Sequence, residues 1–418
     1  MNRLNLISPP LMMWFLRIIY GNLFSGIFIV GAKRTPFGTF GGSFTKTTSL
    51  ELQEVAAKAA LAAANVNPEN VDSVVVGNVL ANTAPDSNFL PRHAALRAGV
   101  PIEKPALGVN RLCGSGFQSI VSGAQSILVG DSEVVLTGGT DNMSQAPFSV
   151  RNIRFGTSLG TKIEFEDTLW TGLTDTHCGL PMALTAEKLG EQFSVTREDC
   201  DKFAYRSQQQ WKKAQDSGVF KEELAPVQVK AKGGVKSIEV DEHPKPETSL
   251  EKLGRLPTIF KKNGLVTAGS ASGVCDGAGA VVLASEDAVK KYNLKPLARL
   301  VAYAIVGVEP SIMGIGPSPA IKNLLKTANK SLNDIDLVEI NEAFAAQTLS
   351  CAKDLGLDLE KLNVNGGAIA LGHPLAASGA RITAHLVHEL RRKNLKLGVG
   401  SACIGGGQGI ALLVENAS

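Results

Sequence analysis

A cysteine followed by glycines is the first feature of this chain that can carry chemistry. Cys113 stands in NRLCGSGFQS, and the apolar residues after it recur at helical spacing, which predicts that a helix begins just beyond the cysteine. The free N–H groups and the dipole of a helix N-terminus favour a thiolate. Gly114 and Gly116 leave the thiol open to a ligand. The motif fits a cysteine nucleophile, and it equally fits a buried structural cysteine beside a tight turn.

Three further motifs hold groups that can move a proton or stabilise negative charge. His373, in NVNGGAIALGHPLAASG, stands in a glycine-bordered turn, where a neutral imidazole can take the proton of Cys113. Cys403, in GSACIGGGQG, precedes four glycines whose N–H groups can hold an oxyanion, and a thiol with an ordinary pKa of about 8.5 can exchange a proton. Asn341, in EINEAF, can orient a water. The structural alternatives are a core histidine, a tight glycine turn and a helix cap.

The elements that must position these residues occur twice along the chain. From Ser49 an apolar helical pattern leads to the strand VDSVVVGNV, and SPAIKNLLKTANKSLNDIDLVEINEA repeats that order, so that Asp72 corresponds to Asp336. After each strand, a turn rich in Asn and Gly opens a helix that leads to another strand. These repeats predict an α/β fold with duplicated βαβ halves that share a central layer of helices. The active site is expected where equivalent strand-to-helix turns meet.

The same patterns predict how the chain is divided. Residues 26–144 form the first half, which about 273–295 complete, and residues 296–418 form the second half. Between the halves, residues 145–272 are irregular and richer in Lys, Pro and Gly, which is typical of an inserted loop domain that covers a site or binds a ligand.

Residues 1–25 are predicted to be a leader or targeting segment. The first 24 residues are apolar, carry Arg3 and Arg17, and precede the first acidic residue, Glu51, which is typical of an organelle import signal. A membrane anchor and an unstructured leader are the alternatives. Arg17 interrupts the apolar stretch and GIFIV is better explained as the first core strand, so no stable membrane insertion is expected.

Composition excludes several classes of function. The formal net charge of +3 over 418 residues, without a concentrated basic face, argues against a nucleic-acid partner. The six cysteines are scattered and form no C-x-x-C pair, as expected for free thiols in a reducing compartment. His385 and His388 lie one helical turn apart without a third ligand, so we interpret them as a solvated helix face and predict no metal site.

Taken together, NRLCGSG, NEAF, GHP and SACIGGG, in this order and at these separations, closely resemble the thiolase family. The resemblance runs from about Gly26 to the C-terminus and includes MSQAP, LPMALTAE and SASGVCDGAGA. It is strongest to the 3-ketoacyl-CoA thiolases of mitochondrial fatty-acid oxidation. The implied fold has the two halves in a layered αβαβα arrangement, with the inserted loop domain binding coenzyme A.

The resemblance also implies roles for the reactive residues. Cys113 is then the acylated nucleophile, His373 activates it, and Cys403 is the acid and base. Asn341 holds a catalytic water, and the N–H groups of Cys113 and Gly405 form an oxyanion hole. The implied reaction is thiolytic cleavage of a 3-ketoacyl-CoA to acetyl-CoA and a shortened acyl-CoA, reversible as a Claisen condensation. No cofactor is bound permanently, and coenzyme A is a co-substrate.

For coenzyme A, the resemblance points to Lys245 and Thr248 in DEHPKPETS and to Ala268 and Ser272 in TAGSASG, whereas a solvated loop is the structural alternative. Two residues depart from the family pattern. Lys245 stands where relatives often have arginine, and lysine keeps the charge but loses the bidentate geometry and stacking of arginine. Ala376 stands where glycine usually follows GHPL, and if that position needs a positive φ angle or close backbone contact, alanine costs roughly 1 kcal/mol or more.

Two other functions fit the same motifs: an acetoacetyl-CoA thiolase that condenses two acetyl-CoA molecules, and a non-catalytic acyl-CoA-binding protein. By resemblance we expect a homo-oligomer, either a dimer or a tetramer, in the mitochondrial matrix. A peroxisomal or cytoplasmic location is the alternative. The C-terminal ENAS is not the S-K-L signal, and Pro10 replaces the His or Gln of an N-terminal peroxisomal signal.

Overall fold

The computed structural model describes residues 24–231 and 233–417. All but the last two residues of the predicted leader lie outside the described residues. The described chain forms a ten-stranded sheet with the order β14-β15-β16-β13-β1-β12-β5-β3-β4, in which β2 pairs with β12. The sheet has two parts, because β1 and β13 are joined by only two residue pairs, Phe28 with Arg299 and Ile29 with Ala298.

The first half contributes one part of the sheet and the helices that cover it. Its elements are β1 (Ile27–Arg34), β2 (Gly38–Thr39), α2 (Ser49–Ala64), β3 (Ser73–Gly77), α3 (Leu90–Arg97), β4 (Ala106–Val109), α4 (Ser115–Val129), β5 (Val134–Asn142), β12 (Cys275–Ser285) and α9 (Glu286–Lys291). The predicted first core strand GIFIV, the helix from Ser49 and the helix after Cys113 are confirmed.

The second half repeats this order. Its elements are β13 (Ala298–Gly307), α10 (Pro317–Thr327), β14 (Leu337–Ile340), α11 (Ala345–Leu355), α12 (Ala368–Leu371), α13 (Ala377–Lys393), β15 (Leu397–Ile404) and β16 (Gln408–Asn416). Short 3-10 helices complete both halves and the segment between them: η1 (Pro68–Asn70), η2 (Ser87–Phe89), η3 (Met143–Gln145), η4 (Val219–Glu222), η5 (Pro310–Ile315), η6 (Leu332–Asp334) and η7 (Leu359–Lys361).

The predicted duplication is visible in two matching aspartates. The Asp72 carboxylate accepts the backbone N–H groups of Glu133 and Val134 at the start of β5, at 2.9 and 3.1 Å. The Asp336 carboxylate accepts the N–H groups of Lys396 and Leu397 at the start of β15, both at 2.9 Å. In each half the next strand, β3 or β14, then runs parallel to the strand that the aspartate holds. The two halves therefore share one register as well as one order of elements.

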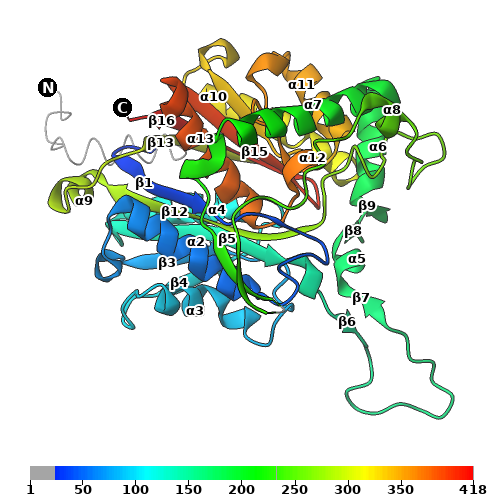
Figure 1. The fold of residues 1–418 in the computed structure, drawn as a ribbon, viewed down its shortest axis with the longest axis horizontal. Coiled ribbons are helices and arrows are strands. Elements are labelled where there is room, and N and C mark those ends of the chain that lie inside the picture. The colour runs from blue at the N-terminus through cyan, green and yellow to red at the C-terminus, as the bar shows by residue number, and fades with distance from the viewer. Residues whose placement is uncertain (1–23, 232, 418) are drawn as a thin grey trace, which may run out of the picture.

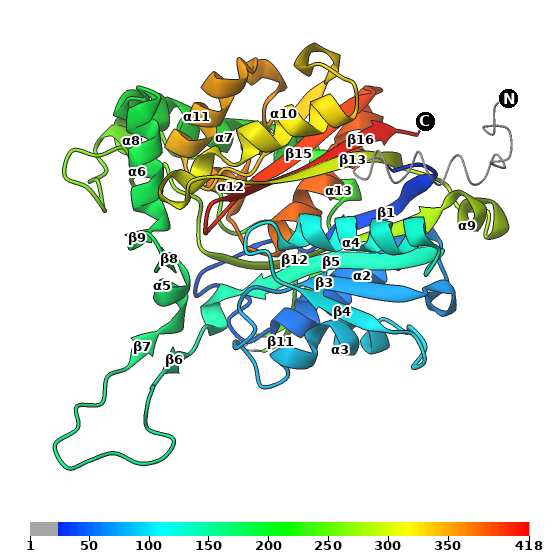
Figure 2. The same cartoon turned by 180° about the vertical axis from the view of Figure 1, so that it is seen from behind.

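Helices and sheet form the predicted five layers (Figure 1). Helices α2 and α3 cover the outer face of one part of the sheet, and α10 and α11 cover the outer face of the other. Helices α4 and α13 lie between the two parts, as the reverse view also shows (Figure 2). Their apolar side chains share one core with strands of both halves. The N-termini of these two central helices bring the turns of Cys113 and His373 to the middle of the molecule.

The segment between the halves consists of helices and small hairpins: β6 (Phe148–Ser149), β7 (Glu166–Asp167), α5 (Thr168–Gly172), β8 (Thr174–Asp175), β9 (Leu180–Pro181), α6 (Met182–Gln192), α7 (Arg197–Asp216), β10 (Val227–Ala231), β11 (Gly234–Ile238) and α8 (Leu250–Gly254). Helices α6 and α7 pack on the second half, while the chain from β6 to β7 projects as an arm (Figure 1). The domain borders at 145 and 272 stay a prediction.

The interpretation of His385 and His388 as a solvated helix face is wrong. His385 is buried, with Nδ1 2.8 Å from Glu223 Oε2 and Nε2 3.1 Å from Asn365 Nδ2. Nε2 of His388 lies 3.0 Å from the Ala32 carbonyl oxygen. The reason is that α13 is a central helix with sheet on two sides. In the described part of the chain, no three His, Cys, Asp or Glu side chains are grouped to hold a metal ion.

The predicted free thiols are confirmed, since all six cysteines are unpaired in the structure. Among the described helices, none combines the length and the apolar character needed to cross a bilayer.

Candidate active site

Cys113 stands in a tight turn between β4 and α4. Leu112 before it has a left-handed backbone with φ of 45°, and α4 begins at Ser115, whose hydroxyl donates back to the Leu112 carbonyl at 2.7 Å. A Cβ atom on Gly114 would lie 2.6 Å from Cδ1 of Ile404, so glycine lets this turn touch the end of β15. The turn therefore fixes the thiol of the first half against the second half.

The Cys113 thiol is protonated in the free protein. Burial raises the pKa of Cys113 to about 11, while hydrogen bonds from the backbone N–H groups of Gly405 and of Cys113 itself act in the opposite direction. The negative charge of Asp141 adds to the rise. The backbone N–H groups favour the thiolate, as predicted, but burial outweighs them in the free protein. A neighbouring base must remove the proton.

His373 lines the same pocket as Cys113 and has a basic side chain. Its backbone N–H donates to the Gly273 carbonyl at 2.9 Å, and its ring Nδ1 lies 2.6 Å from the hydroxyl of Ser378 in the first turn of α13. Burial, together with the positive charge of Arg381, lowers the pKa of His373 to about 3. The imidazole is therefore neutral at physiological pH and has a ring nitrogen that can accept a proton.

Asn341 lies directly after β14 and beside the imidazole. Its Nδ2 atom is 3.3 Å from Nε2 and 3.5 Å from Nδ1 of His373. Its Oδ1 atom is buried and has no hydrogen-bond partner among the described residues. The next residue, Glu342, is buried and accepts hydrogen bonds from Ser207, Asn363 and the N–H of Ile369, which fixes the turn. Asn341 thus presents a free acceptor next to His373.

Cys403 is the penultimate residue of β15 and is fully buried. Burial raises the pKa of Cys403 well above its usual value, and the nearby Cys113 and Cys351 thiols raise it further. Cys403 packs in one apolar cluster with Met313 and Ala343, which also line the pocket described below. The second thiol therefore lies directly behind the pocket that contains the first.

The glycines after Cys403 bend the chain back from β15 into β16. Gly406 and Gly407 have positive φ angles of 77° and 83°, which few other residues adopt. A Cβ atom on Gly405 would lie 3.2 Å from Cδ1 of Leu112. The Gly405 turn and the Cys113 turn therefore touch, and their two N–H groups converge on the Cys113 sulfur.

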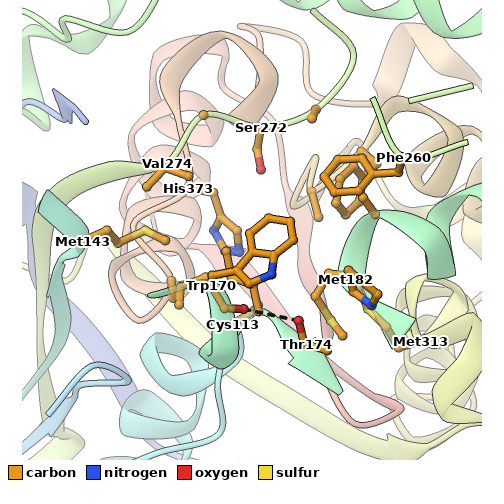
Figure 3. Close-up of a pocket in the computed structure, with 18 residues that line it drawn as sticks. Cys113, Met143, Trp170, Thr174, Met182, Phe260, Ser272, Val274, Met313 and His373 are labelled. Carbon is orange, nitrogen blue, oxygen red and sulfur yellow. Dashed lines mark hydrogen bonds between the residues drawn. The ribbon is translucent and has the colours of Figure 1, made fainter. Parts of the chain in front are cut away.

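Cys113 and His373 open into one pocket with mostly apolar walls (Figure 3). The rings of Trp170 and Phe260 stack across it, with centroids 6.2 Å apart and planes inclined by 7°. The remaining lining residues are Met143, Leu173, Thr174, Pro181, Met182, Ala183, Ala271, Ser272, Gly273, Val274, Met313, Ala343, Phe344 and Leu375. Such walls fit a flexible apolar chain better than a charged group.

Of the four predicted coenzyme A residues, Ser272 lines this pocket. The Lys245 side chain is exposed, while its backbone N–H donates to Gln208 Oε1 at 2.8 Å and its carbonyl accepts the N–H of Thr248 at 3.0 Å. Ala268 is exposed. The structure thus places Ser272 at the pocket, whereas the exposed Lys245 and Ala268 and the half-buried Thr248 lie outside the pocket lining.

Ala376 does not need the conformational freedom of glycine. Its φ and ψ angles are −72° and −24°, in the right-handed helical region, as it caps α13. The cost of roughly 1 kcal/mol expected for a positive φ angle therefore does not arise. Glycine is required instead across from it, because Cβ atoms on Gly139 and Gly116 would lie 2.0 and 2.5 Å from the Ala376 carbonyl oxygen.

Comparisons with known proteins agree with this geometry. The family model described as "Thiolase, N-terminal domain" matches residues 27–287, and "Thiolase, C-terminal domain" matches residues 294–416. The chain belongs to the thiolase family. A mitochondrial 3-ketoacyl-CoA thiolase of Bos taurus is 62% identical over 394 residues, which cover 94% of this chain and 99% of the relative. An acetyl-CoA acetyltransferase of Syntrophomonas wolfei is 43% identical over 93% of this chain and 98% of its own length.

A solved relative shares the whole fold. The crystal structure of human mitochondrial 3-ketoacyl-CoA thiolase in complex with CoA has a TM-score of 0.92 at 60% identity and covers 94% of this thiolase chain and 98% of its own. This match, together with the layers in Figures 1 and 2, confirms the predicted thiolase fold.

Sequence reasoning missed several residues of this thiolase site. Ser378, the partner of His373, is five residues beyond it at the start of the predicted helix, and that spacing was a usable signal. Trp170 and Phe260 come from the irregular inserted segment, where no periodicity marks a pocket wall. Asp141 lies near the end of the buried strand β5, and nothing in the sequence distinguishes it from the rest of that strand.

Proposed function

We propose that this thiolase cleaves 3-ketoacyl-CoA to acetyl-CoA and an acyl-CoA shortened by two carbons, within fatty-acid β-oxidation. The observation that carries the proposal is the convergence of two thiols, an imidazole and an amide, from both halves of the chain, at the end of one apolar pocket. The reversible reaction is a Claisen condensation, so the same residues serve either direction.

Cleavage begins with proton transfer from Cys113 to His373. The pKa values of about 11 and about 3 make the neutral pair the resting state, so the thiolate forms as it attacks the 3-keto carbon of the substrate. His373 and a water on the free Oδ1 of Asn341 stabilise the developing oxyanion. The bond between C2 and C3 then breaks, its electrons pass to the enolate of acetyl-CoA, and Cys403 gives that enolate its proton.

The second step returns the enzyme to its starting state. The acyl group is now a thioester on Cys113, and a second coenzyme A thiol attacks it after giving its proton to the Cys403 thiolate. The N–H groups of Cys113 and Gly405 already point at the Cys113 sulfur, so they are placed to hold the oxyanion of the thioester carbonyl. Release of the shortened acyl-CoA returns the His373 proton to Cys113.

Coenzyme A enters, on this proposal, past Ser272, Ala268, Thr248 and Lys245. His243, two residues before Lys245, packs so closely on Gly273 that a Cβ there would lie 2.0 Å from its Nε2, which ties this loop to the pocket wall. The exposed Lys245 ammonium suits a phosphate at the mouth. The relative solved with CoA and 60% identity supports coenzyme A as the co-substrate.

Compartment and assembly complete the proposal. The relatives named mitochondrial 3-ketoacyl-CoA thiolases support a mitochondrial location. A homo-oligomer is supported by two surfaces in the described chain: the edge strand β4, where Leu107 is 53% exposed, and the projecting arm, where Phe155 is 99% exposed. The arm also exposes Phe148, Ile163 and Phe165, and apolar side chains gathered on one exposed segment are typical of contacts between subunits.

The test is CoA-dependent cleavage of acetoacetyl-CoA and of a longer 3-ketoacyl-CoA by the purified protein, with Cys113→Ala as the control. We expect turnover of both substrates, with a higher kcat/KM for the longer one because the pocket walls are apolar. We expect Cys113→Ala to lose on the order of 10⁴-fold or more in kcat.

Other outcomes favour the alternatives. A preference for acetoacetyl-CoA alone favours the acetoacetyl-CoA thiolase, a function also carried in name by the acetyltransferase relative at 43% identity. Folded protein that binds coenzyme A but turns over neither substrate overturns the proposal in favour of the binding protein.

A further inference from the structure

Asp141 is a buried carboxylate that holds both halves of the active site at once. It stands near the end of β5 in the first half and has no exposed surface. Its Oδ1 atom accepts the N–H groups of Val79 and Leu80 at 3.0 and 2.9 Å and the Asn78 side-chain amide at 3.0 Å. Its Oδ2 atom accepts the N–H of Ala376, in the second half, at 2.7 Å.

The carbonyl group of Ala376 is also held by the first half. Its carbonyl oxygen lies in a slot where Gly139 and Gly116 lack side chains, since Cβ atoms there would approach it to 2.0 and 2.5 Å. Gly139 is two residues before Asp141 on the same strand, and Gly116 is three residues after Cys113 in α4. Both backbone groups of Ala376, the residue just beyond GHPL, therefore contact the first half: the N–H through a hydrogen bond and the C=O through close packing.

The two segments that Asp141 holds meet at Cys113. Leu80, whose N–H donates to Asp141, packs in one cluster with Leu375, Met143 and Cys113. Leu375 immediately precedes Ala376 and lies two residues after His373. A shift of either segment therefore changes the position of the nucleophile relative to its base.

We propose that Asp141 is a positioning residue, which sets the separation of Cys113 and His373 by anchoring the His373 turn to the strand and turn beside Cys113. The inference rests on the roles proposed above for these two residues. A carboxylate is needed because all four partners are hydrogen-bond donors. An asparagine amide could accept from them only through its oxygen, because its nitrogen is itself a donor. Burial raises the pKa of Asp141 to about 6, so the group is charged at neutral pH.

The test is Asp141→Asn in the full-length protein, with steady-state kinetics and the rate of Cys113 acylation in a single turnover. We expect kcat and the acylation rate to fall about 10- to 100-fold, as for a misplacement near 1 Å, with KM changed by less than roughly threefold. A merely structural carboxylate lowers the melting temperature but leaves kcat per folded molecule unchanged.

Asp72→Asn is the matched control. Asp72 also accepts backbone N–H groups of β5, but at the opposite end of that strand. It should lower stability and leave kcat as in the wild type. A folded Asp141→Asn protein with wild-type kcat overturns the proposal. The proposal is also overturned if Asp72→Asn lowers kcat as much as Asp141→Asn does.

Gly139→Ala is a second test, because its methyl group would collide with the Ala376 carbonyl oxygen while the Asp141 carboxylate stays intact. The same loss of kcat is expected, and it decides the question if Asp141→Asn does not fold. Failure of the proposed function is distinguishable, because the wild-type protein would then turn over neither substrate, whereas failure of the Asp141 proposal leaves wild-type turnover intact.

Discussion

The two halves of this thiolase have the same framework but contribute different chemistry. Each holds its inner strands through one aspartate, Asp72 or Asp336, and each sends a turn into a central helix at the middle of the molecule. The first half places Cys113 in that turn, whereas the second half places His373 there and adds Asn341 and Cys403. Duplication thus supplied the geometry twice, and the proposed nucleophile lies in one half while its proposed proton-transfer groups lie in the other.

The largest effect that sharpens this comparison concerns Cys403. In the proposed mechanism Cys403 moves protons but never holds the acyl group, so Cys403→Ala should lower kcat by about 10²- to 10⁴-fold and leave Cys113 reactive. Steady-state kinetics and iodoacetamide labelling of Cys113, located by mass spectrometry, measure the two effects separately. Loss of labelling together with kcat would show that the two thiols act as one unit and would break the division of roles.

The pH dependence of Cys113 follows from its surroundings. With a pKa raised to about 11, the thiolate fraction should increase about tenfold for each pH unit between 7 and 10, because the thiol is protonated below its pKa. The rate of iodoacetamide labelling should follow that slope, and His373→Ala should have the same slope. A plateau near neutral pH in the wild type alone would mean that a thiolate–imidazolium pair already exists in the free protein.

Stability tests compare the two halves through their matching aspartates. Asp72→Asn and Asp336→Asn should each lower the free energy of unfolding by about 1–2 kcal/mol, because each weakens two backbone hydrogen bonds to a carboxylate. Asp72 also has Lys104 at 3.1 Å, worth a few tenths of a kcal/mol more. Urea denaturation at pH 7 measures both, and a large difference between them would contradict the equivalence of the halves.

Acid should remove the Asp72 contribution. Burial acts in the opposite direction, but the N–H groups of Glu133 and Val134 and the Lys104 side chain hold the pKa of Asp72 below its usual value. A lowered pKa in the folded state adds stability above the unfolded pKa, and that stability is lost as pH falls through the folded pKa. The gap between wild type and Asp72→Asn should therefore narrow as the solution is acidified below about pH 4.

The smallest effect is expected at Ala376. Because its φ angle is −72°, Ala376→Gly should not raise kcat and should lower the free energy of unfolding by about 0.5–1 kcal/mol through added freedom of the unfolded chain. Thermal unfolding and kcat are the measurements. A gain in activity would mean that the methyl group strains the His373 turn after all.

The sequence alone was sufficient for the order of the elements. Helical and strand periodicities predicted α2, β3, α4, β5, α13 and β15, and the repeat of Asp72 by Asp336 revealed the duplication, because these signals are local in the chain. The motifs around Cys113, His373, Asn341 and Cys403 carried the family resemblance, because side-chain type and spacing are enough to recognise them.

Tertiary structure decided what those residues experience. Burial outweighs the N–H groups that favour a Cys113 thiolate, so the thiol stays protonated in the free protein. Burial also makes His385 a partner of Glu223 rather than a solvated side chain. Close packing also requires glycine at positions 139 and 116, which contact the Ala376 carbonyl oxygen, and not at position 376 itself. Each outcome depends on atoms far away in the sequence, since solvation and close packing are set by what folds over a residue and not by its neighbours in the chain.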